Sequence, residues 1–228
     1  TIQGQAGTIT DISNTEFNSE YQFLDTDTEG LVIFSIAFSD SSGNNGVQVT
    51  STTNSSWVVF DKTAPADFNT GSVNSTGGNQ VADIWNSTNT GVNVSVPVAG
   101  NDSTIINGKV QIWAKIALNP WEKIGDHFII DSEDSGADKV LAISDSQVEA
   151  ITGFANEDTI TFKTVIIDRA GNEKDGTPSI NRLVIDETLP SITYVSYRSN
   201  FSDSTLAAVG NEITLTLKTN ETVQEPVV

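Results

Sequence analysis

An internal repeat constrains this chain more than any other feature of its sequence. The segments FDKTAP (60–65) and IDETLP (185–190) share the pattern Asp-x-Thr-x-Pro, and each closes an apolar, strand-like run. Their prolines, Pro65 and Pro190, lie 125 residues apart. Similarity at a fixed spacing of this kind is typical of chains built from repeated structural units. The pattern therefore predicts seams between units rather than a single active site.

The similarity extends upstream of both segments. The sequence LVIFSIAFSDSSGNN (31–45) aligns without a gap with TITFKTVIIDRAGNE (159–173), and each copy alternates between two faces, as a strand does. Each copy ends in Asp-x-x-Gly-Asn, a turn signal in which Gly or Asn adopts a positive φ. The matched pairs are Phe34 with Phe162, Asp40 with Asp168, Gly43 with Gly171, and Asn44 with Asn172.

The repeat also continues beyond the prolines. Residues 66–98 and 191–219 share a layout of a first strand, a polar loop, a glycine and a second strand with alternating apolar residues. We therefore expect the C-terminal part of one unit at 1–65, a complete unit at 66–190 and the N-terminal part of a further unit at 191–228. Because partial units leave strand edges unpaired, we expect both ends to need the parent chain or a neighbouring subunit.

The complete unit carries the pattern of an all-β fold. One short helix is expected over 144–154, capped by Ser144 or Asp145, with Val148 and Ile151 pointing inward. Short strands separated by turn signals are typical of an antiparallel β-sandwich. The expected strands cover residues 66–72, 92–98, 108–116, 121–130, 139–144, 159–167 and 182–186.

The order of these motifs resembles tandem bacterial and archaeal immunoglobulin-like repeats of large cell-surface proteins, of the surface-layer or adhesin type. IIDRAGN (166–172) with VIDETLP (184–190) is the best match. FSDSSGNN (38–45) with VFDKTAP (59–65) is a looser copy, with Ser42 in place of the usual alanine. The resemblance covers most of the chain and implies tandem immunoglobulin-like antiparallel β-sandwiches. Its motifs specify architecture far more than function.

Charge and composition narrow the range of partners. Thirty acidic residues against eleven basic ones give a formal net charge of −19. This is the wrong sign for nucleic-acid binding and suits an extracellular protein that gathers cations; a charged surface that only keeps the protein soluble is the simpler alternative. Since the chain has no cysteine, disulfides and cysteine-based zinc sites are excluded. No apolar run approaches the roughly 20 residues of a membrane span.

The sequence does not favour enzyme chemistry. The one histidine, His127, follows Asp126 in a strand pattern, but the sequence has no nucleophile elbow (Gly-x-Ser-x-Gly) and no phosphate-binding glycine loop. With thirty carboxylates, chance pairs are unavoidable and do not indicate a glycosidase. We therefore expect a non-enzymatic chain without catalytic residues.

Two acidic loops are candidate Ca²⁺ sites, because Ca²⁺ takes roughly six to eight oxygen ligands from carboxylates, carbonyls and amides. LDTDTEG (24–30) precedes a strand, and DSEDSGAD (131–138) surrounds Gly136 without EF-hand spacing. Solvated acidic loops are the alternative. The candidate ligands are Asp25, Asp27 and Glu29 in the first loop and Asp131, Glu133, Asp134 and Asp138 in the second.

The aspartates of the repeated turns have a simpler interpretation. Asp61 and Asp186 resemble the linker aspartates of cadherin-type repeats, where calcium stiffens the junction, but Lys62 stands where those linkers are acidic. We expect both to form turns, with a cation at the seam as the alternative. For Asp40 and Asp168 we likewise expect carboxylates that accept backbone N–H bonds within the Gly-Asn turn.

The tryptophans leave a binding function open. Exposed aromatic rings stack on sugars, and Trp113 lies on the opposite face of its strand from the predicted inward positions Val110, Ile112, Ala114 and Ile116. Packing in the core or between domains is nevertheless the favoured interpretation of the tryptophans. Taken together, the patterns predict a structural repeat segment of an extracellular assembly (surface layer, filament or stalk). Its partners would be other copies of the protein or adjacent repeats. An adhesin or carbohydrate-binding module that takes a glycan or cell-surface ligand is the alternative.

Overall fold

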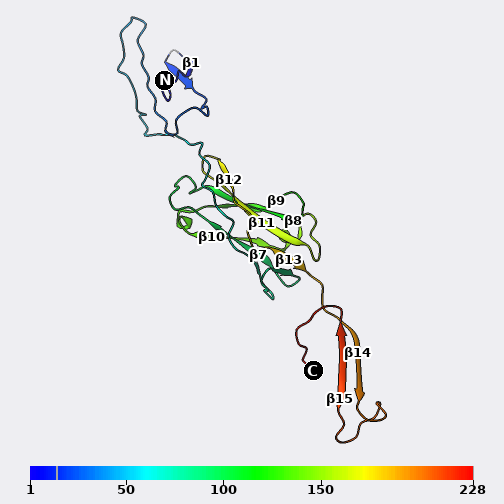
Figure 1. Cartoon of the computed structure of the whole chain (residues 1–228). Coiled ribbons are helices and arrows are strands. Elements are labelled where there is room, and N and C mark those ends of the chain that lie inside the picture. The colour runs from blue at the N-terminus through cyan, green and yellow to red at the C-terminus, as the bar shows by residue number, and fades with distance from the viewer. Residues whose placement is uncertain (14, 228) are drawn as a thin grey trace.

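The computed structural model describes residues 1–13 and 15–227, in which β-strands are far more abundant than helices (Figure 1). The all-β prediction is confirmed. We divide the chain at Pro65 and Pro190 into three parts, named the N-terminal segment (1–65), the central β unit (66–190) and the C-terminal hairpin (191–227). Among the described residues, every buried large apolar side chain lies between Val73 and Ile185, so the hydrophobic core belongs to the central β unit. No helix within residues 1–13 and 15–227 is long and apolar enough to cross a membrane.

Two sheets contribute to this core. The smaller sheet has the antiparallel order β10-β7-β5, and the larger has the order β6-β13-β11-β8-β9, with β12 paired to β11. One pair departs from the antiparallel prediction, because β6 runs parallel to β13. The strands are β5 (Val73–Thr76), β6 (Ile84–Asn86), β7 (Gly91–Pro97), β8 (Lys109–Ile116), β9 (Glu122–Ile129), β10 (Asp138–Ser144), β11 (Thr159–Ile167), β12 (Glu173–Asp175) and β13 (Leu183–Asp186).

Alternating apolar residues on three strands build most of the core. Burial of one valine or isoleucine side chain contributes about 1.5–3 kcal/mol to folding, and Trp85 on β6 adds the bulkiest fully buried side chain. The predicted inward face of β8 is confirmed, and β7 and β11 each turn one alternating face inward. All residues of these three faces are buried: Val92, Val94, Val96 and Val98 from β7 onward, Val110, Ile112, Ala114 and Ile116 on β8, and Ile160, Phe162, Thr164 and Ile166 on β11.

The predicted helix is present as α1 (Asp145–Glu149), and Ser144 is its cap. The Gln147 N–H donates to the Ser144 hydroxyl at 3.3 Å, and the Ser144 N–H donates to the Gln147 side-chain carbonyl at 2.9 Å. This reciprocal capping box satisfies two N–H groups that the helix itself leaves unpaired. Val148 and Ile151 are buried, as predicted.

Some predicted strand positions are wrong. The strand expected at 66–72 forms instead at Val73–Thr76, and β6 and β12 lie in segments expected as loops. The cause is backbone pairing, because β5 is fixed by its ladder to β7, in which Val73 lies opposite Val94. Polar residues such as Asn74 are accepted in a strand whenever a neighbouring strand satisfies the backbone.

Within residues 1–13 and 15–65, the strands form short two-stranded ladders and no extended sheet. The strand predicted over 31–40 pairs only at its first residues and through isolated bridges at Phe34, Ile36 and Ser39. Phe23 stacks on Phe60 with ring centroids 4.4 Å apart. The ladders join β1 (Thr8–Ser13) to β2 (Glu16–Glu20) and β3 (Gly30–Leu31) to β4 (Val59–Phe60).

The C-terminal hairpin consists of β14 (Ile192–Ser199) and β15 (Ile213–Thr219). It lies beyond the central β unit, joined to it by the segment after β13 (Figure 1). Most of its apolar side chains, including Ile213 and Leu215, are exposed.

Candidate functional site

The two Asp-x-Thr-x-Pro seams have the same local geometry. The Asp61 carboxylate accepts the Thr63 N–H at 3.1 Å, and the Asp186 carboxylate accepts the Thr188 N–H at 3.3 Å. Each aspartate therefore closes a turn at the end of its strand, as predicted. The proline that follows keeps the residue before it extended.

A side-chain oxygen from near the start of the facing strand holds each seam. At the first seam the Glu29 carboxylate accepts the Lys62 N–H at 2.6 Å and the Thr63 hydroxyl at 2.8 Å. At the second, the Asn156 side-chain carbonyl accepts the Glu187 N–H at 2.8 Å. The bonds from Lys62 and Thr63 lower the pKa of Glu29 below its ordinary value, because they stabilise the ionised form. Each seam is thus tied to the unit that it closes.

The first Asp-x-x-Gly-Asn turn is held by the carboxylate of Asp40. One oxygen accepts the N–H groups of Ser42 at 2.9 Å and Asn44 at 2.8 Å, and the other accepts the Asn44 side-chain amide at 2.7 Å. Gly43 has a φ of 86°, a region that glycine adopts without strain. The bonds from the side chain and backbone of Asn44 lower the pKa of the Asp40 carboxyl.

The second turn repeats this arrangement and adds a contact across the seam. One Asp168 oxygen accepts the N–H groups of Gly171 at 2.7 Å and Asn172 at 2.9 Å, and the other accepts the Asn172 side-chain amide at 2.8 Å. The predicted role of both aspartates in their turns is confirmed. The Asn172 amide also donates to the main-chain carbonyl of Asp61 at 3.3 Å. A turn of the central β unit therefore bonds to the seam that precedes the unit.

In the first acidic loop, a lysine ammonium lies among the candidate ligands. Lys62 Nζ donates to the main-chain carbonyl of Asp25 and, at 2.9 Å, to that of Asp27. The Asp27 carboxylate is buried within the loop, where it accepts the Tyr21 hydroxyl at 2.8 Å and the Leu24 N–H at 2.7 Å. The bond to Asp27 raises the pKa of Tyr21, because it stabilises the protonated phenol.

In the second acidic loop, the ammonium of Lys139 contacts the carboxylates of two candidate ligands. Its Nζ lies 2.6 Å from an Asp134 oxygen and 3.8 Å from Asp131. Asp134 also accepts the Asp131 N–H at 2.7 Å, around the short 3₁₀ helix η1 (Ser132–Asp134). Burial raises the pKa of Asp134, but the bonds from Lys139 and Asp131 outweigh this effect, so its pKa is lowered.

Each of the remaining candidate ligands has a different environment. Glu133 is exposed, Asp138 accepts the Ser95 hydroxyl at 3.3 Å, and Glu29 accepts bonds at the first seam. Within residues 1–13 and 15–227, three or more His, Cys, Asp or Glu side chains are nowhere grouped so that they could hold a metal ion. A Ca²⁺ ion at the second loop would compete with Lys139 for Asp134. Calcium binding at either loop stays a prediction.

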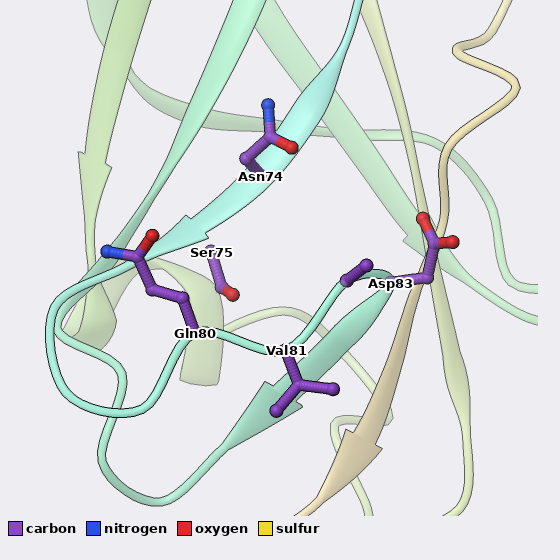
Figure 2. A pocket seen from close by; sticks show the side chains of 6 residues that line it. Asn74, Ser75, Gln80, Val81 and Asp83 are labelled. Atoms are coloured by element: carbon purple, nitrogen blue, oxygen red, sulfur yellow. The ribbon is translucent and has the colours of Figure 1, made fainter.

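A small hollow opens beside β5. Figure 2 shows Asn74 and Ser75 on this strand, with Gln80 and Val81 on the loop that leads to β6. Ligand pockets usually measure about 300–1,000 Å³, so this hollow is smaller than the usual ligand pocket. Its volume is about 150 Å³, and it is lined by Asn74, Ser75, Gln80, Val81, Ala82 and Asp83.

The larger sheet carries a cluster that we name the Trp–Lys face: Trp113, Trp121, Lys115, Lys123 and Lys163. Lys163, Trp113 and Lys123 lie next to one another on β11, β8 and β9. The ammonium groups lie between 5.1 and 5.6 Å from the ring centroids, within the range of cation–π attraction. Three of the eleven basic residues of an acidic chain therefore gather around two aromatic rings.

We did not predict the lysines of the Trp–Lys face from the sequence, and we did not predict which tryptophans are buried. Trp85 is in the core, whereas Trp57 is 67 % exposed. The sequence did offer a signal for these lysines, because Lys115 and Lys163 occupy outward positions in strands whose residues alternate between two faces. A lysine at such a position covers its neighbour across the sheet. The approach of Lys62 to the first acidic loop had no local signal.

No protein-family model matches the chain, and no curated protein matches it significantly.

Proposed function

We propose that this chain is a structural repeat segment of an extracellular cell-surface assembly, such as a surface layer, a filament or a stalk. In this proposal the repeated units are tandem immunoglobulin-like β-sandwiches, and the Asp-x-Thr-x-Pro seams set the angle between successive units. Calcium stiffens the segment where it binds. In this function, mechanical load passes from one unit to the next through the seams, and catalysis has no part.

The recurrence of one seam geometry carries this proposal. Each seam combines an aspartate turn, a proline and a backbone N–H that donates to a side chain near the start of the facing strand, Glu29 at the first seam and Asn156 at the second. At the first seam, Asn172 adds a bond from the unit that follows. A flexible tether would require none of these contacts, because glycine- and serine-rich linkers behave as random coils.

Small-angle X-ray scattering of the chain tests whether the seams are stiff. Replacement of residues 61–65 and 186–190 by glycine and serine should broaden the distribution of interatomic distances, because the three parts then reorient freely. The same replacement at the exposed loop 51–55 is the matched control and should leave the distribution unchanged. Identical scattering from the seam variant and the unaltered chain would contradict a structural role for the seams.

A second candidate function rests on the Trp–Lys face. Aromatic rings stack on sugars, and the ammonium groups of Lys123 and Lys163 add positive charge to an otherwise acidic protein. This combination favours an anionic glycan, as expected of an adhesin or a carbohydrate-binding module. Lys163 is partly neutralised by Asp175, at 2.5 Å, which weakens the case.

Glycan binding separates the two candidates. If the Trp–Lys face binds an acidic polysaccharide such as alginate, Trp121→Ala should abolish retention in affinity electrophoresis. Trp57→Ala, at a tryptophan that is 67 % exposed and far from this cluster in the sequence, is the control. Equal migration of all three proteins with and without the polysaccharide would remove this alternative for that ligand class.

A further inference from the structure

The first and last segments of the central β unit lie side by side and run in the same direction. Asn69, near the start of the unit, forms a parallel bridge with Thr177, near its end. The Thr70 N–H donates to the Thr177 carbonyl, and the Thr177 N–H donates to the Phe68 carbonyl, both at 3.0 Å. The backbone on the two sides of the core is therefore joined directly, across more than a hundred positions of sequence.

Side chains extend this contact in both directions. The Thr177 hydroxyl donates to the Asn69 side-chain carbonyl at 2.5 Å, and the Ser179 hydroxyl donates to the main-chain carbonyl of Gly71 at 2.6 Å. We name residues 67–71 together with 174–179 the terminal clamp. Its contacts advance in the same order along both segments, from Asp67 with Lys174, through Asn69 with Thr177, to Gly71 with Ser179.

The first segment of the terminal clamp is also anchored in the core. Thr70 and Thr164 are buried with their hydroxyls 3.1 Å apart, and the Thr164 N–H on β11 donates to the Thr70 hydroxyl at 2.9 Å. Phe68 packs against the core cluster. A Cβ at Gly176 would lie 2.5 Å from the Phe68 ring, so glycine lets this ring lie directly on the second segment. The first segment therefore cannot leave the unit without opening the core.

Tension along the chain reaches the two segments at opposite ends. The seam proline Pro65 lies just before the first segment, and the seam that ends in Pro190 follows the second. Figure 1 shows the chain entering the central β unit beside β12 and leaving it after β13, at the other end of the unit. A pull on both seams therefore draws two parallel segments past each other along their length. Contacts loaded in this direction resist together, whereas a pull that separates the segments sideways breaks them one after another.

We propose that the terminal clamp carries mechanical load across the central β unit and sets the force at which the unit opens. The inference deepens the proposed function, on which its biological role rests, by naming the contact that keeps a unit folded while the seams transmit tension. Forced unfolding is governed by the unfolding rate and not by the equilibrium free energy of unfolding. A few bonds in the path of the force are therefore sufficient for this role.

Optical tweezers test the effect of pulling direction, and the chain has no cysteine of its own, so introduced cysteines fix where DNA handles pull. Ala66→Cys with Leu189→Cys loads the terminal clamp along its length. Ala66→Cys with Glu173→Cys pulls the same end of both segments apart, and all three positions are exposed. At equal force the folded lifetime should be at least about tenfold longer with the first pair, because its barrier requires the contacts to break together. The released length, roughly 3.3–3.6 Å per residue, identifies the opening event.

Two hydroxyl deletions test the bonds of the terminal clamp itself. Thr177→Val and Ser179→Ala, each pulled through Ala66→Cys and Leu189→Cys, should shorten the folded lifetime about two- to tenfold, because each removes a bond across the clamp. Ser144→Ala is the matched control, since it removes the hydroxyl that caps α1 and lowers stability away from the clamp. Its lifetime under force should stay within about twofold of the unaltered chain. Circular dichroism of each variant checks that it folds.

Two outcomes would overturn the clamp proposal. One is a lifetime that is no longer with the lengthwise pair than with the sideways pair, since the parallel contact would then add no resistance. The other is a larger effect of Ser144→Ala than of both clamp variants, because the barrier to opening would then lie elsewhere in the unit. The scattering test concerns the orientation of the parts at the seams and not the opening of the central β unit, so the clamp proposal and the proposed function fail separately.

Discussion

The side-chain amide of Asn172 donates to the main-chain carbonyl of Asp61 at 3.3 Å, between residues 111 positions apart in the sequence. Asn172 is fixed for this contact by its own turn, in which Asp168 accepts both its N–H and its amide. Two residues beyond, Lys174 forms an ion pair with Asp67, two residues after Pro65. The turn and the strand after it therefore hold the polypeptide on both sides of the seam proline.

Loss of the Asn172 amide should loosen the first seam. Asn172→Ala removes one hydrogen bond across the seam and one within the turn, and a typical hydrogen bond contributes about 0.5–1.5 kcal/mol. Tryptic cleavage after Lys62 reports the population of the open seam when opening is fast relative to cleavage. We expect cleavage to accelerate roughly two- to tenfold.

The first repeat supplies the control for this experiment. Asn44 makes the same bond to Asp40 within its turn, at 2.7 Å, and its side-chain hydrogen bond stays within that turn. Asn44→Ala should leave cleavage after Lys62 unchanged. Equal acceleration by both variants would show that the rate reflects general destabilisation and not the bond to Asp61.

Acid should weaken the second acidic loop through Asp134. Its folded-state pKa is lower than the ordinary value of 3.8, so the ionised form contributes stability at higher pH. That contribution is complete above the unfolded-state pKa and is lost as the pH falls through the folded-state pKa. The thermal midpoint of the central β unit should therefore decrease below about pH 4, and this decrease should be smaller in Asp134→Asn. Parallel pH profiles for both proteins would contradict the assignment.

Trp85 offers a test of the core. It is fully buried, and among the described residues no acceptor bonds its indole N–H. Trp85→Ala should cost about 3–5 kcal/mol, because it leaves a large cavity. Trp85→Phe should cost less than about 1.5 kcal/mol, because it removes an unpaired donor along with part of the ring. Urea unfolding followed by circular dichroism measures both, with the exposed Trp57→Phe expected within about 0.5 kcal/mol of the unaltered chain.

The two copies of the repeated strand pattern have similar sequences but different structures. Residues 31–40 alternate as well as residues 159–167 do, yet only the second stretch is a continuous strand, β11. The difference lies in the neighbours, because β11 pairs with β8, β12 and β13 along its length. In the N-terminal segment the corresponding partners are single residues, such as Ile2 opposite Phe34. Pairing between distant strands is not readable from a local pattern.

The candidate site shows the same division between local and distant contacts. The turns at Asp40, Asp61, Asp168 and Asp186 could be predicted, because each carboxylate bonds backbone groups two to four residues away. The contact of Lys62 with the carbonyl of Asp27 could not, since it joins residues 35 positions apart. The bond from Asn172 to Asp61 escaped prediction for the same reason.

Calcium binding at the second acidic loop can be tested by replacing Lys139, which would compete with the ion for Asp134. Extracellular calcium modules bind with dissociation constants of about 0.1–1 mM, so about 10 mM calcium should stabilise the chain by about 1.4–2.7 kcal/mol and raise the thermal midpoint by several degrees. Lys139→Gln frees Asp134 and Asp131 and removes a positive charge, so the shift should be larger in this variant. Arg182→Gln, at an exposed position, is the control for charge alone. A shift below about 1 °C in all three proteins would contradict calcium as a stabiliser; an equal shift in all three would place the ion away from the second loop.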